Sequence, residues 1–284
     1  MSTPRITSRR IAATATDVAC QALGRRAVIR AARYVLLRAR LDYPNNMTSN
    51  GESALQRWVL ELAPDGELHV ADVGANVGLW SRSLLVAAST AGRAADVRLH
   101  AFEPDAGAYA RLERALHGAL AVLSPVALSD RPGTSTFHTV GPAAGTNSLH
   151  LAPGTLATAA PVSTITLDSY AAQSGLSRFA LVKIDTEGHD LTVLRGARAM
   201  LAEHRISVVQ FEYNHRWVFA RAFLRDAFEF LVELGYQVGK LTPKGVEFYP
   251  GWDADLETFV EGNYVACDPS VAGRLPIVPW WKTR

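Results

Sequence analysis

The sequence predicts an α/β domain built on a mostly parallel sheet. Short apolar runs alternate with segments of helical periodicity from about residue 53 onward, and this alternation is typical of a parallel sheet covered by helices. The runs are short and mostly apolar, as expected of strands that are buried on both faces. Several runs end in acidic or small polar residues, which would gather those groups along one edge of the sheet.

Five parallel strands and their connecting helices are predicted in chain order. The strands are 68–74, 97–103, 121–128, 180–185 and 206–212, and the helices are 53–62, 78–88, 106–117, 190–202 and 218–234. Glycine, proline or acidic residues bound most of these segments, as is usual where strands and helices end. Further strands at 236–241, 246–249 and 263–266 would complete the sheet.

Three parts are predicted along the chain: a basic helical extension (1–50), a main domain (51–268) and a C-terminal tail (269–284). Within the main domain, residues 129–168 interrupt the alternation of strands and helices. They contain an exposed strand at 134–140 and then small residues from 141 onward. This segment is predicted to be an insertion or lid and a possible acceptor-binding loop.

The extension is rich in arginine, with nine arginines and one acid among its first 40 residues. Apolar residues recur between the arginines at helical spacing, but no segment is long and apolar enough to span a bilayer. Interfacial helices and transit peptides share this composition. We prefer a helix that packs on its own domain or on a second subunit, which would give a homodimer.

Overall charge and cysteine content exclude some classes of protein. The net charge of +2 gives no reason to expect nucleic-acid binding. Cys20 and Cys267 lie far apart without the spacing of a zinc site or a disulfide framework. A reducing, cytoplasmic location is expected.

A glycine turn follows the first strand, in the segment Asp72-Val73-Gly74-Ala75-Asn76-Val77-Gly78. Glycines at such a junction let a ligand approach the backbone, and the free N–H groups of the next helix can meet its polar atoms. Asn76 stands where a dinucleotide fingerprint requires glycine, and Asp72 could accept hydrogen bonds from an ammonium group. The turn therefore favours an amino-acid-bearing ligand such as S-adenosylmethionine.

Polar groups also follow the second and third strands. Glu103 ends the second strand and could accept both hydrogen bonds of a ribose diol, although Pro104 and Asp105 after it could simply begin a helix. Ser129 and Asp130 follow the third strand, where they could contact an adenine amine. These residues indicate a nucleoside ligand without identifying it.

The fourth strand runs into a junction that contains Asp185, Glu187 and His189. Two acids and an imidazole at a strand end can deprotonate a hydroxyl, bind a divalent cation or position a substrate. First-turn acids that interact with the helix dipole are the structural alternative. The fifth strand adds Glu212 and Asn214 at its end, so four or five strands would deliver polar groups to one edge.

In these motifs the chain resembles the FkbM family of class I S-adenosylmethionine-dependent methyltransferases, over about residues 50 to 267. The segments that carry the resemblance are 72–78, Phe102-Glu103-Pro104, Ala127-Leu128-Ser129-Asp130, Asn147-Ser148-Leu149, Thr166-Leu167-Asp168, Lys183-Ile184-Asp185-Thr186-Glu187-Gly188-His189-Asp190 and Leu194-Arg195-Gly196-Ala197. The resemblance implies a Rossmann-like sandwich with a seven-stranded sheet whose last strand is antiparallel. It also implies S-adenosylmethionine as cofactor and methylation of a hydroxyl on a polyketide, sugar or related metabolite.

We assign the expected site residues on this basis. The expected cofactor contacts are Asp72, Gly74, Asn76, Gly78, Glu103, Ser129 and Asp130, and the expected acceptor contacts are Asn147, Tyr213 and Asn214. His189 is the first choice of base because an unperturbed imidazole titrates near neutrality, Glu187 is the second, and Asp185 would orient the base or bind a metal. A Mg²⁺-assisted reaction would use Asp185, Glu187 and Glu212.

Two other functions remain open at this stage. A nicotinamide-dependent oxidoreductase would share the glycine turn and Glu103, although the missing middle glycine argues against it. A non-catalytic member would keep the fold as a binding module. The partners expected in either enzyme class are small molecules, without nucleic acid and without a membrane-spanning segment.

Overall fold

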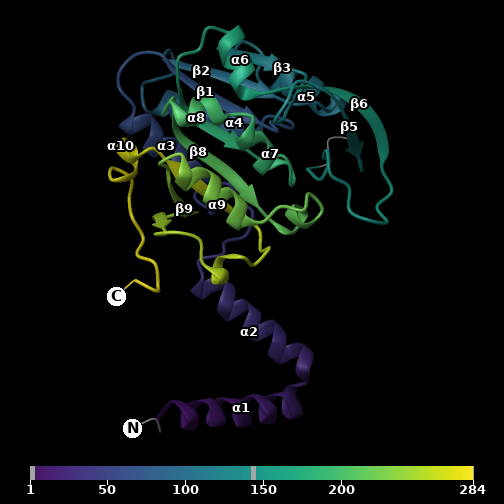
Figure 1. The fold of residues 1–284 in the computed structure, drawn as a ribbon, viewed down its shortest axis with the longest axis vertical. Coiled ribbons are helices and arrows are strands. Elements are labelled where there is room, and N and C mark those ends of the chain that lie inside the picture. Colours follow the sequence, from purple (N-terminus) through teal and green to yellow (C-terminus); the bar gives the residue numbers. More distant parts are fainter. Residues whose placement is uncertain (1–3, 142–144, 284) are drawn as a thin grey trace. The chain divides into compact units, whose positions relative to one another are not determined.

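The structure, a computed structural model, describes residues 4–141 and 145–283. The chain divides into two compact units, residues 1–43 and residues 44–284. The first contains α1 (Pro4–Leu23) and α2 (Arg25–Ala39), separated by Gly24 with a φ of 81° (Figure 1). The predicted N-terminal helices are therefore present.

The second unit is built on a sheet of eight strands among the described residues, in the order β10-β9-β11-β8-β7-β1-β2-β3. The strands are β1 (Leu68–Val73), β2 (Val97–Phe102), β3 (Ala121–Ser124), β7 (Phe179–Ile184), β8 (Ile206–Tyr213), β9 (Gln237–Thr242), β10 (Gly245–Phe248) and β11 (Gly262–Cys267). Neighbours from β8 to β3 are parallel, and β11 is antiparallel to β8 and β9. The predicted mostly parallel sheet with an antiparallel last strand is confirmed, and β10 extends the expected seven strands by pairing with β9.

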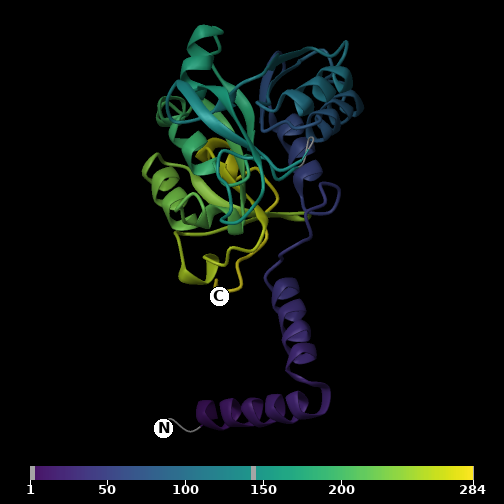
Figure 2. The same ribbon diagram turned by 90° about the vertical axis from the view of Figure 1, so that its right-hand side faces the viewer.

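Helices cover both faces of this sheet and form two hydrophobic cores. One core joins α3 (Glu52–Leu62), α4 (Leu79–Thr90) and α5 (Ala106–Ala115) to one face, through side chains such as Leu55, Leu84 and Leu112. The other core joins α6 (Leu167–Gln173), α7 (Asp190–Arg195), α8 (Arg198–Ala202) and α9 (Leu224–Glu233) to the opposite face. Figure 2 shows the two layers on opposite sides of the sheet. This three-layer arrangement explains why most residues of the central strands are apolar.

The strand expected at 121–128 is divided into two. β3 ends at Ser124, and β4 (Ala127–Leu128) leaves the main sheet to pair with β6 (Thr158–Ile165). Pro125 lies at the break, and proline cannot donate a hydrogen bond to a sheet. The expectation of one strand was wrong because the change of sheet depends on a partner far along the chain.

Two of the expected helices are also shorter than the periodicity suggested. The helix expected at 190–202 is divided into α7 and α8 around Gly196, where a Cβ would overlap the backbone oxygen of Ser129. The helix expected at 218–234 begins only at Leu224 and is preceded by a 3-10 turn, η1 (His215–Val218). In both places an apolar pattern continues through a local turn, so periodicity alone overestimates helix length.

Residues 129–168 form a small second sheet rather than only a loop. β5 (Gly133–Thr139) pairs antiparallel with β6, and the order in this sheet is β4-β6-β5. The small-residue stretch expected after residue 140 includes residues 142–144, which lie outside the described part. The return strand β6 was not predicted because its exposed residues carry little apolar pattern.

The C-terminal residues pack against the sheet edge. After α10 (Pro269–Ala272), Ile277 bridges to Val246 of β10. The ring of Trp280 meets that of Tyr249 edge-on at 5.3 Å between centroids.

Candidate active site

The carboxyl ends of β1, β2 and β7 open into one cavity of about 350 Å³. This volume lies within the usual range of small-molecule pockets. The lining includes the turn after β1, the acid after β2 and the junction after β7, so three motifs that are far apart in the sequence share one space. Ligands of open α/β sheets bind at this end of the strands.

The glycine turn is shaped by two close approaches of the chain. Gly74 has a φ of 76°, and a Cβ there would overlap the backbone oxygen of Asp185. Gly78 has a φ of 82° at the start of α4, and a Cβ there would lie 2.8 Å from Leu112. Only glycine combines a left-handed φ with such close contact. Both glycines therefore hold the backbone against its neighbours, while the cavity is lined by Gly74 but not by Gly78.

Glu103 connects the first two strands at the cavity wall. Its Oε2 accepts from the backbone N–H of Asn76 at 2.8 Å, and its Oε1 accepts from that of Asp105 at 2.8 Å. Burial raises the pKa of Glu103 to about 7, with the two N–H donors opposing that effect. The buried Oδ1 of Asn76 has no hydrogen-bond partner among the described residues, so this wall offers acceptor atoms to a ligand.

Asp72 lies outside the cavity lining, in contrast to its expected contact with the ligand. Its Oδ2 accepts from the hydroxyl of Ser81 at 2.6 Å, and its Oδ1 lies 3.2 Å from Nζ of Lys183. Lys183 itself lines the cavity, donates to the backbone oxygen of Gly74 at 3.4 Å and lies 3.3 Å from Oδ2 of Asp185. The surrounding carboxylates raise the pKa of Lys183 against the opposing effect of its burial. Lys183 therefore links the glycine turn after β1 to the junction after β7.

Two charged residues near the cavity, Lys183 and Glu52, have no role that is evident from the sequence. Glu52, at the start of α3, accepts from Asn50 at 2.6 Å and from Gln210 at 3.1 Å, and burial raises its pKa. It lies in the first turn of α3, where acids commonly interact with the helix dipole, so the sequence alone gives no sign of a further role. For Lys183 the available signal was a lysine inside an apolar strand, because lysine is almost never buried without a partner.

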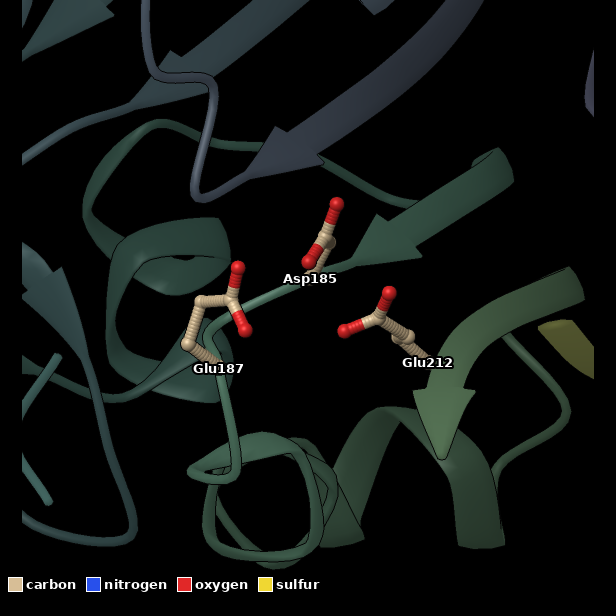
Figure 3. A group of neighbouring side chains, drawn as sticks. All are labelled: Asp185, Glu187 and Glu212. Atoms are coloured by element: carbon tan, nitrogen blue, oxygen red, sulfur yellow. The ribbon is translucent and has the colours of Figure 1, made fainter. Parts of the chain in front are cut away.

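Three carboxyl groups meet beside the cavity, and two of them, those of Asp185 and Glu187, line it. Asp185, Glu187 and Glu212 each place an oxygen within 4.8 Å of the others. Figure 3 shows their carboxyl groups turned toward a shared space between the ends of β7 and β8. Glu212 accepts hydrogen bonds from the side-chain amides of Asn45, at 3.4 Å, and Asn214, at 2.6 Å. The residues expected to bind a metal are therefore together.

This cluster concentrates negative charge in a partly buried place. Burial, followed by the charge of Asp185, raises the pKa of Glu187 to about 8, although Arg216 forms an ion pair with it. Burial, followed by the charge of Asp185, also raises the pKa of Glu212. Burial raises the pKa of Asp190 to about 7. Each acid holds its proton more tightly because like charges and low solvation disfavour ionisation.

The loop that carries Glu187 has an unusual backbone. Glu187 has a φ of 56° and Gly188 a φ of 100°, and a Cβ on Gly188 would lie 3.0 Å from the backbone oxygen of Arg216. A left-handed glutamate costs about 1 kcal/mol or more. Such conformations cluster at functional sites, which supports a role for the Glu187 carboxyl.

His189 is held between two other side chains. Its Nε2 lies 3.0 Å from Oγ of Ser129, and its Nδ1 lies 3.0 Å from Nε2 of His150. Burial lowers the pKa of His189 to about 4, and His150 adds to that effect. The imidazole is therefore neutral near pH 7, and both ring nitrogens already have partners.

The remaining expected residues lie in several places. Asn147 lines the cavity and donates to Asp105 at 3.4 Å. Ser129 and Asp130 line a second, polar cavity of about 290 Å³, which His189 also lines. Tyr213 is fully buried in the core and donates to Glu257 at 2.7 Å, so it does not reach the cavity. Asn214 does not line the cavity but holds Glu212.

The residues present fit S-adenosylmethionine. The unpartnered Oδ1 of Asn76 and the carboxyl of Glu103 offer acceptors for its amino and hydroxyl groups. The cavity size also suits a ligand of this kind. A mostly parallel sheet with an antiparallel last strand, this glycine turn and an acid after β2 form the arrangement expected of a class I methyltransferase.

Comparison with known proteins assigns the family. Residues 72–238 match the Methyltransferase FkbM domain. The chain therefore belongs to the FkbM methyltransferase family and is an S-adenosylmethionine-dependent enzyme. This assignment selects a methyltransferase over the oxidoreductase that the sequence had left open. A search of curated proteins gives no match.

Three of the solved structures that are similar to the chain are methyltransferases of low identity. Precorrin-6y C5,15-methyltransferase from Geobacter metallireducens GS-15 is 14% identical, covering 76% of this chain and 87% of that one, with a TM-score of 0.38. A TehB-like methyltransferase from Corynebacterium glutamicum is 14% identical, with 84% and 94% covered and a TM-score of 0.35. The CurJ carbon methyltransferase is 10% identical, with 82% and 58% covered and a TM-score of 0.43.

No helix among the described residues is both long enough and apolar enough to cross a membrane.

Proposed function

We propose that the protein transfers a methyl group from S-adenosylmethionine to a hydroxyl group of a small metabolite, such as a polyketide, a sugar or a related natural product. The observation that carries this proposal is that Glu103 and Glu187 line the same cavity. The first is suited to a nucleoside and the second to a reacting hydroxyl. A single cavity would hold both reactants in contact, which is the main requirement for direct displacement.

When bound, S-adenosylmethionine supplies an electrophilic methyl carbon. The hydroxyl oxygen of the acceptor forms a bond to that carbon as the carbon–sulfur bond breaks, and the hydroxyl proton passes to a base. Glu187 suits the role of base because its raised pKa lies near neutrality. Arg216 holds the Glu187 carboxyl in place through their ion pair. Asp185, beside it, keeps that pKa high and can orient the hydroxyl.

His189 becomes the second choice of base, in contrast to the order expected from the sequence. Its lowered pKa makes it a weak proton acceptor, and its ring nitrogens contact Ser129 and His150. It suits a positioning role at the start of α7. The exchange of roles between His189 and Glu187 follows from burial, because burial lowers the pKa of an imidazole and raises the pKa of a carboxyl group.

The test is transfer of an isotopically labelled methyl group to a panel of matched alcohols, amines and activated carbon acids. Methyl ether formation is expected. Glu187→Gln should reduce kcat by about 10²-fold or more, while the affinity for S-adenosylhomocysteine changes little. Arg111→Gln, on an exposed face of α5, is the control. Methylation at nitrogen or carbon in preference to oxygen would refute the proposal, and so would full activity of the Glu187 variant.

A Mg²⁺-assisted version is the second candidate, supported by the three converging carboxyl groups. Hard oxygen ligands are those that Mg²⁺ prefers, and the ion could bind the acceptor oxygen and favour its ionisation. Lys183 and Arg216 already contact Asp185 and Glu187, so they would compete with the ion for those oxygens. Removal of metal distinguishes the two versions.

A further inference from the structure

The N-terminal unit carries a charge opposite to that of the rest of the chain. Residues 1–43 contain nine arginines, no lysine and two aspartates, Asp17 and Asp42, so their formal charge is +7. The whole chain carries +2, so residues 44–284 carry −5. Arginine can bind phosphate oxygens through two parallel N–H donors. The positive charge is therefore concentrated in one unit, on the side chain best suited to phosphate.

Helix α2 arranges its apolar and basic side chains in two neighbouring stripes. Steps of three and four residues place side chains on one face of a helix. The apolar stripe consists of Val28, Ile29, Ala32, Val35, Leu36 and Ala39. Arg26, Arg30 and Arg33 recur at the same steps and form a basic stripe beside it. The helix is thus amphipathic, with arginine next to its apolar face.

These apolar side chains are largely exposed. No residue of α2 is buried, and Ile29, Val35 and Leu36 are 59%, 64% and 56% exposed. Helix α1 presents a second apolar stripe that includes Ile11 and Val18, which are also exposed. Large apolar side chains that are exposed on successive turns mark a surface that a partner covers.

The positive charge and the exposed apolar surface of the N-terminal helices together indicate which class of partner they bind. A nucleic acid would match the arginines but would leave the apolar stripes in water. An anionic membrane surface matches both, because phosphate headgroups lie next to acyl chains. We propose that residues 4–40 bind in the plane of an anionic lipid surface, with the apolar stripe of α2 in the acyl boundary and its arginines on the headgroups.

The test is flotation of the full-length protein with vesicles of phosphatidylcholine alone or mixed with phosphatidylglycerol. Binding to the anionic vesicles is expected, and high salt should weaken it. A charge variant combines Arg26→Gln, Arg30→Gln and Arg33→Gln, and an apolar variant combines Ile29→Gln, Val35→Gln and Leu36→Gln. Each should lower the partition coefficient at least about tenfold. A matched control, Arg82→Gln with Arg111→Gln and Arg114→Gln, changes three exposed arginines of α4 and α5 and should bind like the wild type.

Several results would overturn the proposal. These are equal binding to neutral and anionic vesicles, unaltered binding by either variant, and binding to duplex DNA in place of vesicles. Self-association that the apolar variant abolishes, without any vesicle binding, would identify a second copy as the partner instead. Binding of S-adenosylhomocysteine by every variant shows that residues 44–284 remain folded, so failure here is distinguishable from failure of the proposed reaction.

Discussion

Nζ of Lys183 lies 3.2 Å from Oδ1 of Asp72, and both side chains are buried, although Lys183 also lines the cavity. Asp72 belongs to β1, which leads into the cofactor turn, and Lys183 belongs to β7, which leads into the acidic junction. The pair thus connects the two halves of the site through adjacent strands. A buried charge pair of this kind is costly to break, because the remaining partner keeps an uncompensated charge.

Lys183→Met should therefore destabilise the protein by about 3 to 5 kcal/mol. Asp72→Asn should cost less, since Lys183 keeps Asp185 as a partner. The double variant should be more stable than the sum of the two single effects predicts, by about 1 kcal/mol or more. Urea unfolding of the four proteins measures this coupling, and additive effects would show that the pair does not act as a unit.

Gly74→Ala should impair both stability and cofactor binding. Gly92→Ala is the matched control, because Gly92 has a similar φ of 71° but open space around its Cα. Both variants carry a backbone cost of about 1 to 2 kcal/mol. The overlap with Asp185 should add about 1 to 3 kcal/mol at position 74 alone. Thermal unfolding and calorimetry with S-adenosylhomocysteine measure the two effects; equal behaviour of the variants would contradict the close approach seen at Gly74.

The affinity for S-adenosylhomocysteine should rise with pH through the titration of Glu103. Burial raises its pKa to about 7 in the free protein, so the carboxyl is mostly protonated at pH 6 and mostly ionised at pH 8. A ribose diol donates hydrogen bonds and so favours the ionised form. If only that form binds, the affinity increases about tenfold between these pH values.

Glu103→Gln provides the control, since it removes this titration and leaves those of Glu187 and Asp190. The affinity of this variant for S-adenosylhomocysteine should be lower than that of the wild type and nearly constant over the same pH range in calorimetric titrations. The sign is opposite for stability: a raised carboxyl pKa contributes stability that is complete below about pH 4.5 and is lost as the pH rises through about 7. A pH dependence that persists unchanged in Glu103→Gln would assign it to other groups.

Removal of metal tests the Mg²⁺-assisted version. If the ion binds the carboxyl cluster, chelator treatment should abolish methyl transfer, Mg²⁺ should restore it, and Glu212→Gln should weaken Mg²⁺ binding about tenfold or more. The direct version predicts full activity of the stripped enzyme. Calorimetric titration of Mg²⁺ into the wild type and Glu212→Gln measures Mg²⁺ binding without the need for an acceptor. Unaltered activity after stripping, together with no Mg²⁺ binding, would exclude the metal.

The sequence predicts the sheet well because its strands are apolar runs that end at polar groups. Asp185, Glu187 and Glu212 could be placed on one edge from strand order alone, and the structure brings them together. The sequence predicts the fold less well where a contact between distant residues decides the local structure. Gly196 lies between α7 and α8, where the backbone oxygen of Ser129 occupies the space that a Cβ would need, and no local pattern contains this contact.

The roles of individual site residues were the hardest to predict. Asp72 has the residue type and position of a ligand-binding acid, but Lys183 and Ser81 occupy its oxygens. Tyr213 follows Glu212 directly, but successive side chains of a strand point to opposite faces of the sheet, so Tyr213 of β8 lies in the core. Protonation also depends on burial, which makes His189 a weaker base and Glu187 a stronger one than their unperturbed pKa values suggest.

The most direct test of the central claim is a crystal structure of the protein with S-adenosylhomocysteine. The claim is that one cavity holds the nucleoside on Glu103 and the reacting centre near Glu187. The predicted complex has the ribose hydroxyls at hydrogen-bond distance, about 3 Å, from the Glu103 carboxyl, and the sulfur on the side of Asp185 and Glu187. A ribose bound away from Glu103, or a sulfur that faces the Ser129 cavity instead, would contradict it.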